Sequence, residues 1–136
     1  MADADAKTKI DWRLELIAVP VSDVDRAKSF YVDQVGFNDD EDHQVSDELR
    51  FVQLTPQGSG CSIALTTGAH QMEPGSLEGL QLVVEDAEAA RAELVERGVD
   101  ASEVQDFPWG RFVFFSDPDG NGWSVQQIDY PGKPGA

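Results

Sequence analysis

The chain has 136 residues, 40% of them hydrophobic and 26% charged, with 12 glycines, 7 prolines and one cysteine. This length and composition predict one globular domain with a core of its own. The single cysteine, Cys61, excludes an internal disulfide, and apolar runs of only a few residues exclude a membrane span, which needs roughly 20. Because the chain opens with acidic residues where a signal peptide carries basic and then apolar ones, we expect a cytoplasmic protein.

The charge balance is strongly acidic, with 26 Asp and Glu against 10 Lys and Arg and a net charge of -16. A surface of this sign repels phosphate backbones and anionic lipid heads, so we expect no nucleic-acid partner and no membrane partner. The acidic excess indicates high solubility, and adaptation to a salty cytoplasm is an alternative that the composition leaves open.

A weak internal repeat appears when the chain is laid over itself at an offset of about 62 residues. The matching segments occur in the same order in both copies: 21–27 with 84–90, Gly36 with Gly98, and 50–55 with 111–116. We therefore interpret the chain as two copies of one module.

Each copy predicts the same series of elements, namely a strand, a helix and three further strands. Short β-branched runs predict the strands, while Ser22 or Asp23 can cap the first helix and Gly36 and Gly98 can end the two helices. The first copy places its elements at 14–21 (strand), 23–34 (helix), 37–42, 49–55 and 61–67 (strands). The second copy places them at 80–84 (strand), 86–97 (helix), 100–104, 110–116 and 122–129 (strands).

Two stretches resemble the vicinal oxygen chelate superfamily, which contains glyoxalase I, extradiol dioxygenases and bleomycin-resistance proteins. They are Val-Ser-Asp-Val-Asp-Arg-Ala-Lys-Ser-Phe-Tyr at 21–31, followed by Gly36-Phe37, and Asp-Pro-Asp-Gly-Asn-Gly-Trp at 117–123. The resemblance implies an α+β fold in which two tandem βαβββ modules form a curved, open, barrel-like mixed sheet around a cavity. It also implies a homodimer.

This fold predicts one domain over 11–130, made of module one (11–68), a linker (69–77) and module two (78–130). We expect residues 1–10 to be disordered and residues 131–136 to be loose, because chain ends without a packing partner are poorly ordered.

Side chains along a strand alternate between two faces, so the face turned away from the helix must form the cavity wall. This alternation, with Trp109 taken from a loop at the rim, predicts a ligand-binding set of hydrocarbon, aromatic, hydroxyl and amide side chains: Leu16, Phe51, Gln53, Ser62, Ala64, Gln81, Trp109, Phe114, Ser124 and Gln126. For Trp109, packing in the core is an open alternative.

The resemblance places the metal ligands of the family's enzymes at four strand positions, which here hold Leu16, Ala64, Gly79 and Ser124. None of these residues binds a divalent metal strongly, because such metals prefer carboxylate, imidazole or thiolate groups. A one-residue slip of the first strand would bring Glu15 inward, but it would supply only one ligand. The sequence therefore predicts no metal and no cofactor.

Other reactive side chains have structural interpretations that we prefer. His43 lies in an acidic stretch and is expected in a solvated loop, Cys61 is expected as a buried structural thiol, and Arg111 is expected to pair with neighbouring carboxylates. Asp117 and Asp119 flank a proline and precede a glycine, so they predict a turn rather than a catalytic pair.

Three functions remain in competition. The first is a metal-free protein that binds a small apolar or aromatic molecule, for resistance or sequestration. The second is a glyoxalase-like, metal-dependent lyase or dioxygenase, which needs ligands that the predicted cavity lacks. The third is a metal-free isomerase or cyclase, for which only His70 and Tyr130 offer acid–base groups.

Overall fold

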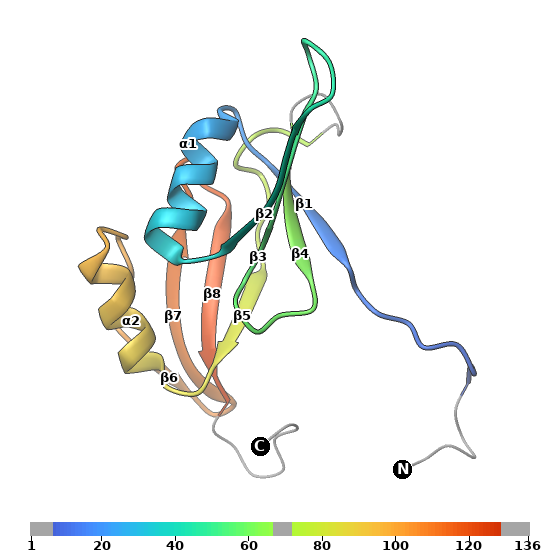
Figure 1. Ribbon diagram of the computed structural model, residues 1–136. Helices are drawn as coiled ribbons and strands as arrows, with labels where there is room; N and C mark the ends of the chain where they lie inside the picture. The colour runs from blue at the N-terminus through green and yellow to red at the C-terminus, as the bar shows by residue number, and fades with distance from the viewer. Residues whose placement is uncertain (1–6, 67–71, 129–136) are drawn as a thin grey trace.

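The computed structural model describes residues 7–66 and 72–128. The predictions for residues 1–6, for residues 67–71 at the end of module one and the start of the linker, and for residues 129–136 lie outside this range, and so do His70 and Tyr130. Figure 1 shows both helices on one side of the molecule and the N-terminal segment leaving on the other side. No helix in the described part of the chain is long and apolar enough to cross a membrane.

The first module forms a four-stranded mixed sheet in the order β1-β4-β3-β2, in which β1 runs parallel to β4 and the other pairs are antiparallel. Its elements are β1 (Leu16–Pro20), α1 (Val24–Ser29), the π-helical turn η2 (Phe30–Val35), β2 (Asn38–Gln44), β3 (Arg50–Thr55) and β4 (Ser62–Thr66). We call this sheet A.

The second module repeats this arrangement in the order β5-β8-β7-β6, with β5 parallel to β8. Its elements are β5 (Leu80–Val84), α2 (Ala87–Glu96), β6 (Gln105–Phe107), β7 (Gly110–Ser116) and β8 (Gly122–Gln127). We call this sheet B. The matching topologies confirm the α+β fold of two βαβββ modules, and the two sheets stay open.

The helices begin and end at the predicted signals. Asp23 and Asp86 accept hydrogen bonds from backbone N–H groups of the first turns of α1 and α2, as N-caps do. Gly36 ends the first helical segment in the left-handed conformation. The π-helical turn was not predicted, and the two residues that begin it, Phe30 and Tyr31, are both buried.

One strand prediction was wrong. Residues 100–104 form no strand, and the first strand after α2 is β6, which pairs with β7 only from Gln105 onward. The segment before it is held through Ser102 instead, whose carbonyl accepts from Arg91 Nε and whose N–H donates to the carbonyl of Phe114. A single backbone hydrogen bond to β7 at this point replaces the ladder of hydrogen bonds that the predicted strand would form.

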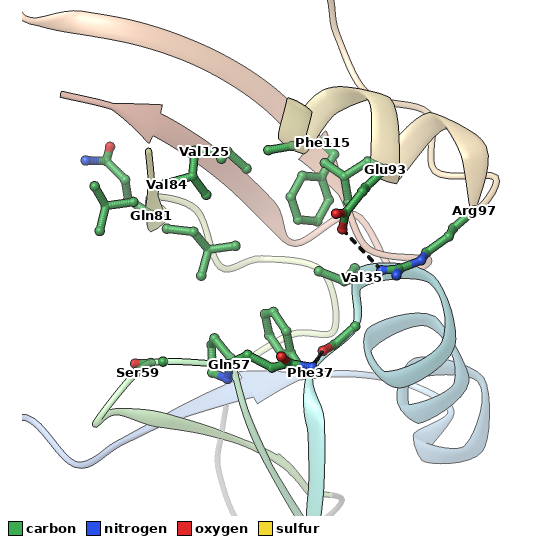
Figure 2. A pocket seen from close by; sticks show the side chains of 17 residues that line it. Val35, Phe37, Gln57, Ser59, Gln81, Val84, Glu93, Arg97, Phe115 and Val125 are labelled. Atoms are coloured by element: carbon green, nitrogen blue, oxygen red, sulfur yellow. Dashed lines mark hydrogen bonds and ion pairs between the residues drawn. The ribbon is translucent and has the colours of Figure 1, made fainter. Parts of the chain in front are cut away.

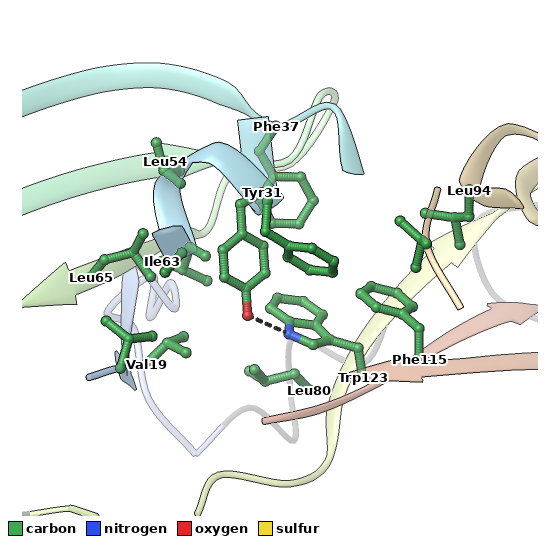
Figure 3. Packing of buried hydrophobic residues seen from close by; sticks show 14 of the residues in the cluster. Val19, Tyr31, Phe37, Leu54, Ile63, Leu65, Leu80, Leu94, Phe115 and Trp123 are labelled. Carbon is green, nitrogen blue, oxygen red and sulfur yellow. Dashed lines mark hydrogen bonds between the residues drawn. The ribbon is translucent and has the colours of Figure 1, made fainter. Parts of the chain in front are cut away.

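The two modules share one hydrophobic core. The Tyr31 ring lies 5.6 Å from the rings of both Phe37 and Trp123, and the Phe115 ring stacks on Trp123 at 6.0 Å (Figure 3). Aliphatic side chains of both sheets complete the cluster, among them Val52, Leu54, Ile63, Leu65, Val113 and Val125. The helix-facing sides of both sheets therefore meet in this core, and the alternate side chains of each strand point away from it.

The turn at 117–121 holds the modules together with polar contacts. The buried Asp117 carboxylate accepts hydrogen bonds from Tyr31 Oη, from Asn121 Nδ2 and from the backbone N–H groups of 119–121. Asp119 accepts from Ser22 and pairs with Arg26 at 3.2 Å. These contacts confirm the structural interpretation of the Asp-Pro-Asp-Gly segment.

Candidate functional site

A row of aromatic rings covers the face of sheet B that points away from the core. Because β7 alternates, Val113 and Phe115 enter the core while Phe112 and Phe114 lie on the opposite face. Phe112 and Phe114 stack at 5.9 Å, and Phe107 meets Phe112 edge-on at 5.5 Å. Trp109 extends the row, because its ring stacks on Phe107 at 5.5 Å.

The row is accessible to a ligand at both ends. Trp109 is 55% exposed and Phe114 is 39% exposed, whereas Phe112 between them is buried. Exposed aromatic rings in a row offer a large flat contact area for a planar molecule. With this exposure Trp109 is not packed in the core, and its contribution to a ligand site stays a prediction.

A chain of amide and hydroxyl groups runs beside the aromatic row. Gln81 Nε2 donates to Gln126 Oε1 at 2.6 Å, and Ser124 Oγ donates to Gln81 Oε1 at 3.1 Å. The chain ends where Gln126 Nε2 donates to the carbonyl of Trp109 at 3.1 Å. Each of these groups keeps further donor or acceptor capacity, so the face combines hydrocarbon with polar contacts at its edge.

Gly110 allows this arrangement. Its φ is 153°, and a Cβ at this position would lie 2.7 Å from Gln127 O and 3.0 Å from Gln126 Nε2. Real Cβ atoms do not approach a backbone carbonyl this closely, so a side chain at Gly110 would displace the amide that holds Trp109. The tight β6–β7 turn and the position of the Gln126 side chain therefore depend on each other.

The equivalent face of sheet A carries the other half of the predicted set. Gln53 Nε2 donates to Ser62 Oγ at 3.3 Å, and Ser62 Oγ also lies 2.7 Å from Thr55 Oγ1. Leu16 pairs in register with Ser62, and Ala64 pairs with Gln53, which places all of them on one face. Phe51 belongs to the same face through its pairing with Thr66.

The predicted residues thus form two groups on two sheets, and the contacts within each group are local to its sheet. The register places the strand residues of each group on one face of their sheet, as the alternation predicted. That these residues bind a ligand stays a prediction. Sequence reasoning missed Phe107, which it assigned to a loop, although the spacing of Phe107 and Trp109 around Pro108 would suit two rings on the same side of a tight turn.

Two hollows lie beside sheet B, and of the predicted residues Gln81 lines the first, while Phe114 and Ser124 line the second. One is a cleft of about 640 Å³ between the modules, with Val35, Phe37 and Gln57 on one side and residues of β5, α2 and β7 on the other (Figure 2). The other, of about 670 Å³, is lined by Phe114, Ser124, Glu78 and Asp100 among others. Both volumes are within the range of small-molecule sites.

The positions that correspond to the family's metal ligands do not fit a metal ion. Leu16 and Ala64 are hydrocarbon, Gly79 has no side chain, and the Ser124 hydroxyl donates to Gln81. Within residues 7–66 and 72–128, no group of three or more His, Cys, Asp or Glu side chains is close enough to hold a metal ion.

The remaining reactive side chains are outside both groups. His43 is exposed and contacts Glu41, as expected for a solvated histidine, but it lies in β2 and not in the expected loop. Cys61 is half-buried rather than buried, because it precedes β4 and does not enter the core. Arg111 pairs with Asp106 and Glu88, and the hydrogen bond to Asp106 in particular raises the pKa of its guanidinium.

Comparison with known proteins gives the family. The model of the Glyoxalase/Bleomycin resistance protein/Dioxygenase superfamily matches residues 13–125. The chain belongs to this superfamily. Its predicted membership in the vicinal oxygen chelate group and its predicted fold are therefore confirmed.

Several solved structures are similar over most of their length. TnmS3, described as an antibiotic binding protein from Streptomyces sp. CB03234, is 42% identical, covers 90% of this chain and 99% of its own, and superimposes with a TM-score of 0.81. A glyoxalase/bleomycin resistance protein from the same organism is 43% identical, covers 85% of this chain and 100% of its own, and has a TM-score of 0.75.

A relative is also found by sequence. YetH, an uncharacterized protein of Bacillus subtilis (strain 168), is 30% identical over 111 residues, which are 77% of this chain and 89% of YetH.

Proposed function

We propose that this member of the superfamily binds a small, planar, apolar or aromatic molecule without a metal ion, for sequestration or resistance, and that it does so as a cytoplasmic homodimer. The observation that carries the proposal is the aromatic row of Phe107, Trp109, Phe112 and Phe114 beside the polar chain of Gln81, Ser124 and Gln126. The antibiotic-binding description of the similar TnmS3 supports it.

The geometry sets the chemistry of the ligand. Stacking on the rings favours a flat, conjugated body, and the exposed ends of the row leave room for it to slide over Phe114 toward the second hollow. The amides and the hydroxyl favour carbonyl or hydroxyl groups at one edge of that body, since a buried polar group needs a partner. The ligand is held by contacts alone, with no bond made or broken.

A metal-dependent lyase or dioxygenase finds less support. Such an enzyme uses its metal as a Lewis acid on vicinal oxygens, and this chain presents hydrocarbon and one hydroxyl where the ligands would stand. We therefore retain binding as the function and treat the enzyme as an outcome of the test.

The test compares binding before and after removal of metals. Polycyclic aromatic compounds with carbonyl or hydroxyl edges are screened by thermal shift, and a compound present at 100 times its Kd should stabilise the fold by about 2.7 kcal/mol. We expect the shift to be the same after treatment with a chelator. A stoichiometric metal that is needed for binding, or turnover of the bound compound, would overturn the proposal.

A further inference from the structure

The cleft between the two modules lies outside the site proposed above. Its volume is about 640 Å³, and Val35, Phe37 and Gln57 of the first module face residues of β5, α2 and β7 across it (Figure 2). Of the aromatic row and the polar chain beside it, only Gln81 lines this cleft. A molecule bound there would leave the rings of the row free, so the cleft is a candidate for a second site.

Much of the cleft lining is hydrocarbon that belongs to the core of the protein. The lining includes four buried core residues and two half-buried residues of β5: Phe37, Leu94, Phe115, Val125, Leu82 and Val84. Removing apolar surface from water is favourable, so the cleft favours a ligand with a hydrocarbon body. Such a body would contact both modules at once.

Arg97 supplies a positive charge to this apolar cleft. It is the one basic side chain that the described lining contains, and Figure 2 shows it reaching from the end of α2 toward Val35. Its backbone carbonyl accepts a hydrogen bond of 3.1 Å from Gln34 Nε2, which ties the end of α2 to the first module. Gly36 leaves room for the guanidinium, because a Cβ at this position would lie 2.9 Å from Arg97 Nη1.

The hydrogen-bond donors of this guanidinium are unused. Within residues 7–66 and 72–128, each of the other arginines donates a side-chain hydrogen bond, whereas Arg97 donates none. Arg97 forms only an ion pair of 3.7 Å with Glu93, in which the two side chains are 44% and 72% exposed. Exposed ion pairs of this kind contribute little to stability, so the planar set of N–H donors is available to another carboxylate.

We propose that the cleft binds a small amphipathic monocarboxylate, with its hydrocarbon body against Leu82, Val84 and Phe115 and its carboxylate on the guanidinium of Arg97. The charge decides between ligands of one shape, because a neutral molecule leaves the Arg97 donors unpaired and an ammonium group is repelled by them. Glu93 is too exposed to compensate for that repulsion. The proposal does not depend on ligand binding at the aromatic row.

The acidic surface does not prevent this binding. The net charge of -16 opposes the approach of any anion at long range. At about 0.15 M salt, however, exposed charges separated by more than roughly 8 Å are largely screened from each other, whereas a direct contact with Arg97 is screened much less. The experiments below are therefore carried out at this salt concentration.

The first experiment compares octanoate, octanol and octylammonium, which differ only in the polar end, by isothermal titration near neutral pH. Octanoate should bind about tenfold more tightly than octanol, because only the carboxylate forms charge-assisted hydrogen bonds with Arg97. Octylammonium should bind more weakly than either. Absence of octanoate binding, or equal or tighter binding of octanol or octylammonium, would overturn the proposal.

The second experiment tests the role of Arg97. Arg97→Gln should raise the Kd of octanoate about tenfold and leave the Kd of octanol unchanged. Glu93→Gln, which removes the competing carboxylate, should lower the Kd of octanoate. The control is Arg13→Gln, which removes the same charge from a side chain that is 82% exposed and outside the cleft. Equal effects of Arg97→Gln and Arg13→Gln would show that net charge, and not contact, sets the affinity, and the proposal would fail.

The third experiment locates the hydrocarbon body. Ala90 lines the cleft from α2, whereas Ala92 of the same helix is exposed and outside it. Ala90→Leu should therefore weaken binding of both octanoate and octanol, and Ala92→Leu should not, with circular dichroism to check that both variants are folded. Trp109→Ala should also leave octanoate binding unchanged. Weaker octanoate binding in Trp109→Ala, or unchanged binding in Ala90→Leu, would place the probe outside the cleft and contradict the inference without deciding whether flat aromatic compounds bind the row.

Discussion

Tyr31 of the first module donates a hydrogen bond of 2.7 Å to the buried carboxylate of Asp117 in the second module, across 86 positions of sequence. The same hydroxyl accepts a hydrogen bond of 2.8 Å from the indole N–H of Trp123. The described partners of the carboxylate are all neutral donors, including Asn121 and three backbone N–H groups. Removing any member therefore leaves a buried polar group without a partner.

Tyr31→Phe should lower the free energy of unfolding by about 1–3 kcal/mol, because Trp123 Nε1 loses its acceptor and Asp117 loses a donor. Urea titration followed by circular dichroism measures the change. Asp117→Ala should cost more, since it also releases the N–H groups of residues 119–121. If Tyr31→Phe unfolds at the same urea concentration as the wild type, the hydrogen bond contributes nothing to stability.

Stability should fall at alkaline pH in a way that depends on Tyr31. Burial, and next the Asp117 charge, raise the pKa of Tyr31 far above its ordinary value of 10.0. The folded state thus keeps a proton that the unfolded chain releases, so this contribution is complete below pH 10 and decreases as the pH rises above it. The decrease approaches about 1.4 kcal/mol per pH unit.

The measurement compares wild type and Tyr31→Phe by urea unfolding at several pH values above 10. The wild type should lose stability more steeply, and the difference between the two proteins should shrink as the pH rises. The chain has two tyrosines. The absorbance change that marks ionisation of Tyr31 should accompany unfolding, because the folded state keeps this residue protonated. Parallel pH profiles for the two proteins would contradict the shifted pKa.

Replacing Trp109 or Phe114 by alanine should weaken ligand binding with little loss of stability, because both rings are partly exposed. Loss of one stacking partner corresponds to about 0.5–1.5 kcal/mol, which is roughly a twofold to tenfold rise in Kd. Isothermal titration with the best compound of the screen measures it. Val45→Ala, an exposed apolar residue on another part of the surface, serves as the control and should leave Kd unchanged. Unchanged binding in both ring variants would move the site away from the aromatic row.

Gly110→Ala should affect stability and binding together. The added Cβ meets Gln127 O and the Gln126 amide, so the fold should lose more than about 1 kcal/mol and Trp109 should lose its hydrogen bond. Thermal unfolding and the Kd for the same compound are the two measurements. Gly58→Ala is the matched control, because it also has a positive φ but no neighbour within 4 Å of the new Cβ. Equal effects of the two substitutions on Kd would show that the contact with Gln126 is unimportant for the site.

The strands whose apolar and polar residues alternate could be predicted from the sequence. The limits of β5 and β7 agree with their apolar runs, and the alternation along β3, β4 and β8 assigned Gln53, Ser62 and Ser124 to the face turned away from the helices. These predictions rest on local geometry, in which one residue in two points to the core.

The long-range contacts could not be predicted in this way. The π-helical turn at Phe30–Val35 interrupts the expected regular helix, and the hydrogen bond from Tyr31 depends on Asp117 of the other module. The order of the rings from Trp109 to Phe114 depends on the register of β6 against β7. The sequence analysis placed the strand that corresponds to β6 at 100–104, five residues too early. Local patterns carry no information on which strands meet.

The common core of Tyr31, Phe37, Phe115 and Trp123 has a consequence for the duplicated sequence. A half-chain on its own would expose this aromatic surface to water, and it would aggregate or pair with a second half to cover it. Fragments cut at the linker should therefore regain structure only when mixed, and the intact chain should melt in one cooperative step. The tandem arrangement of the two modules therefore makes this core contact intramolecular, whereas separate modules would have to associate to form it.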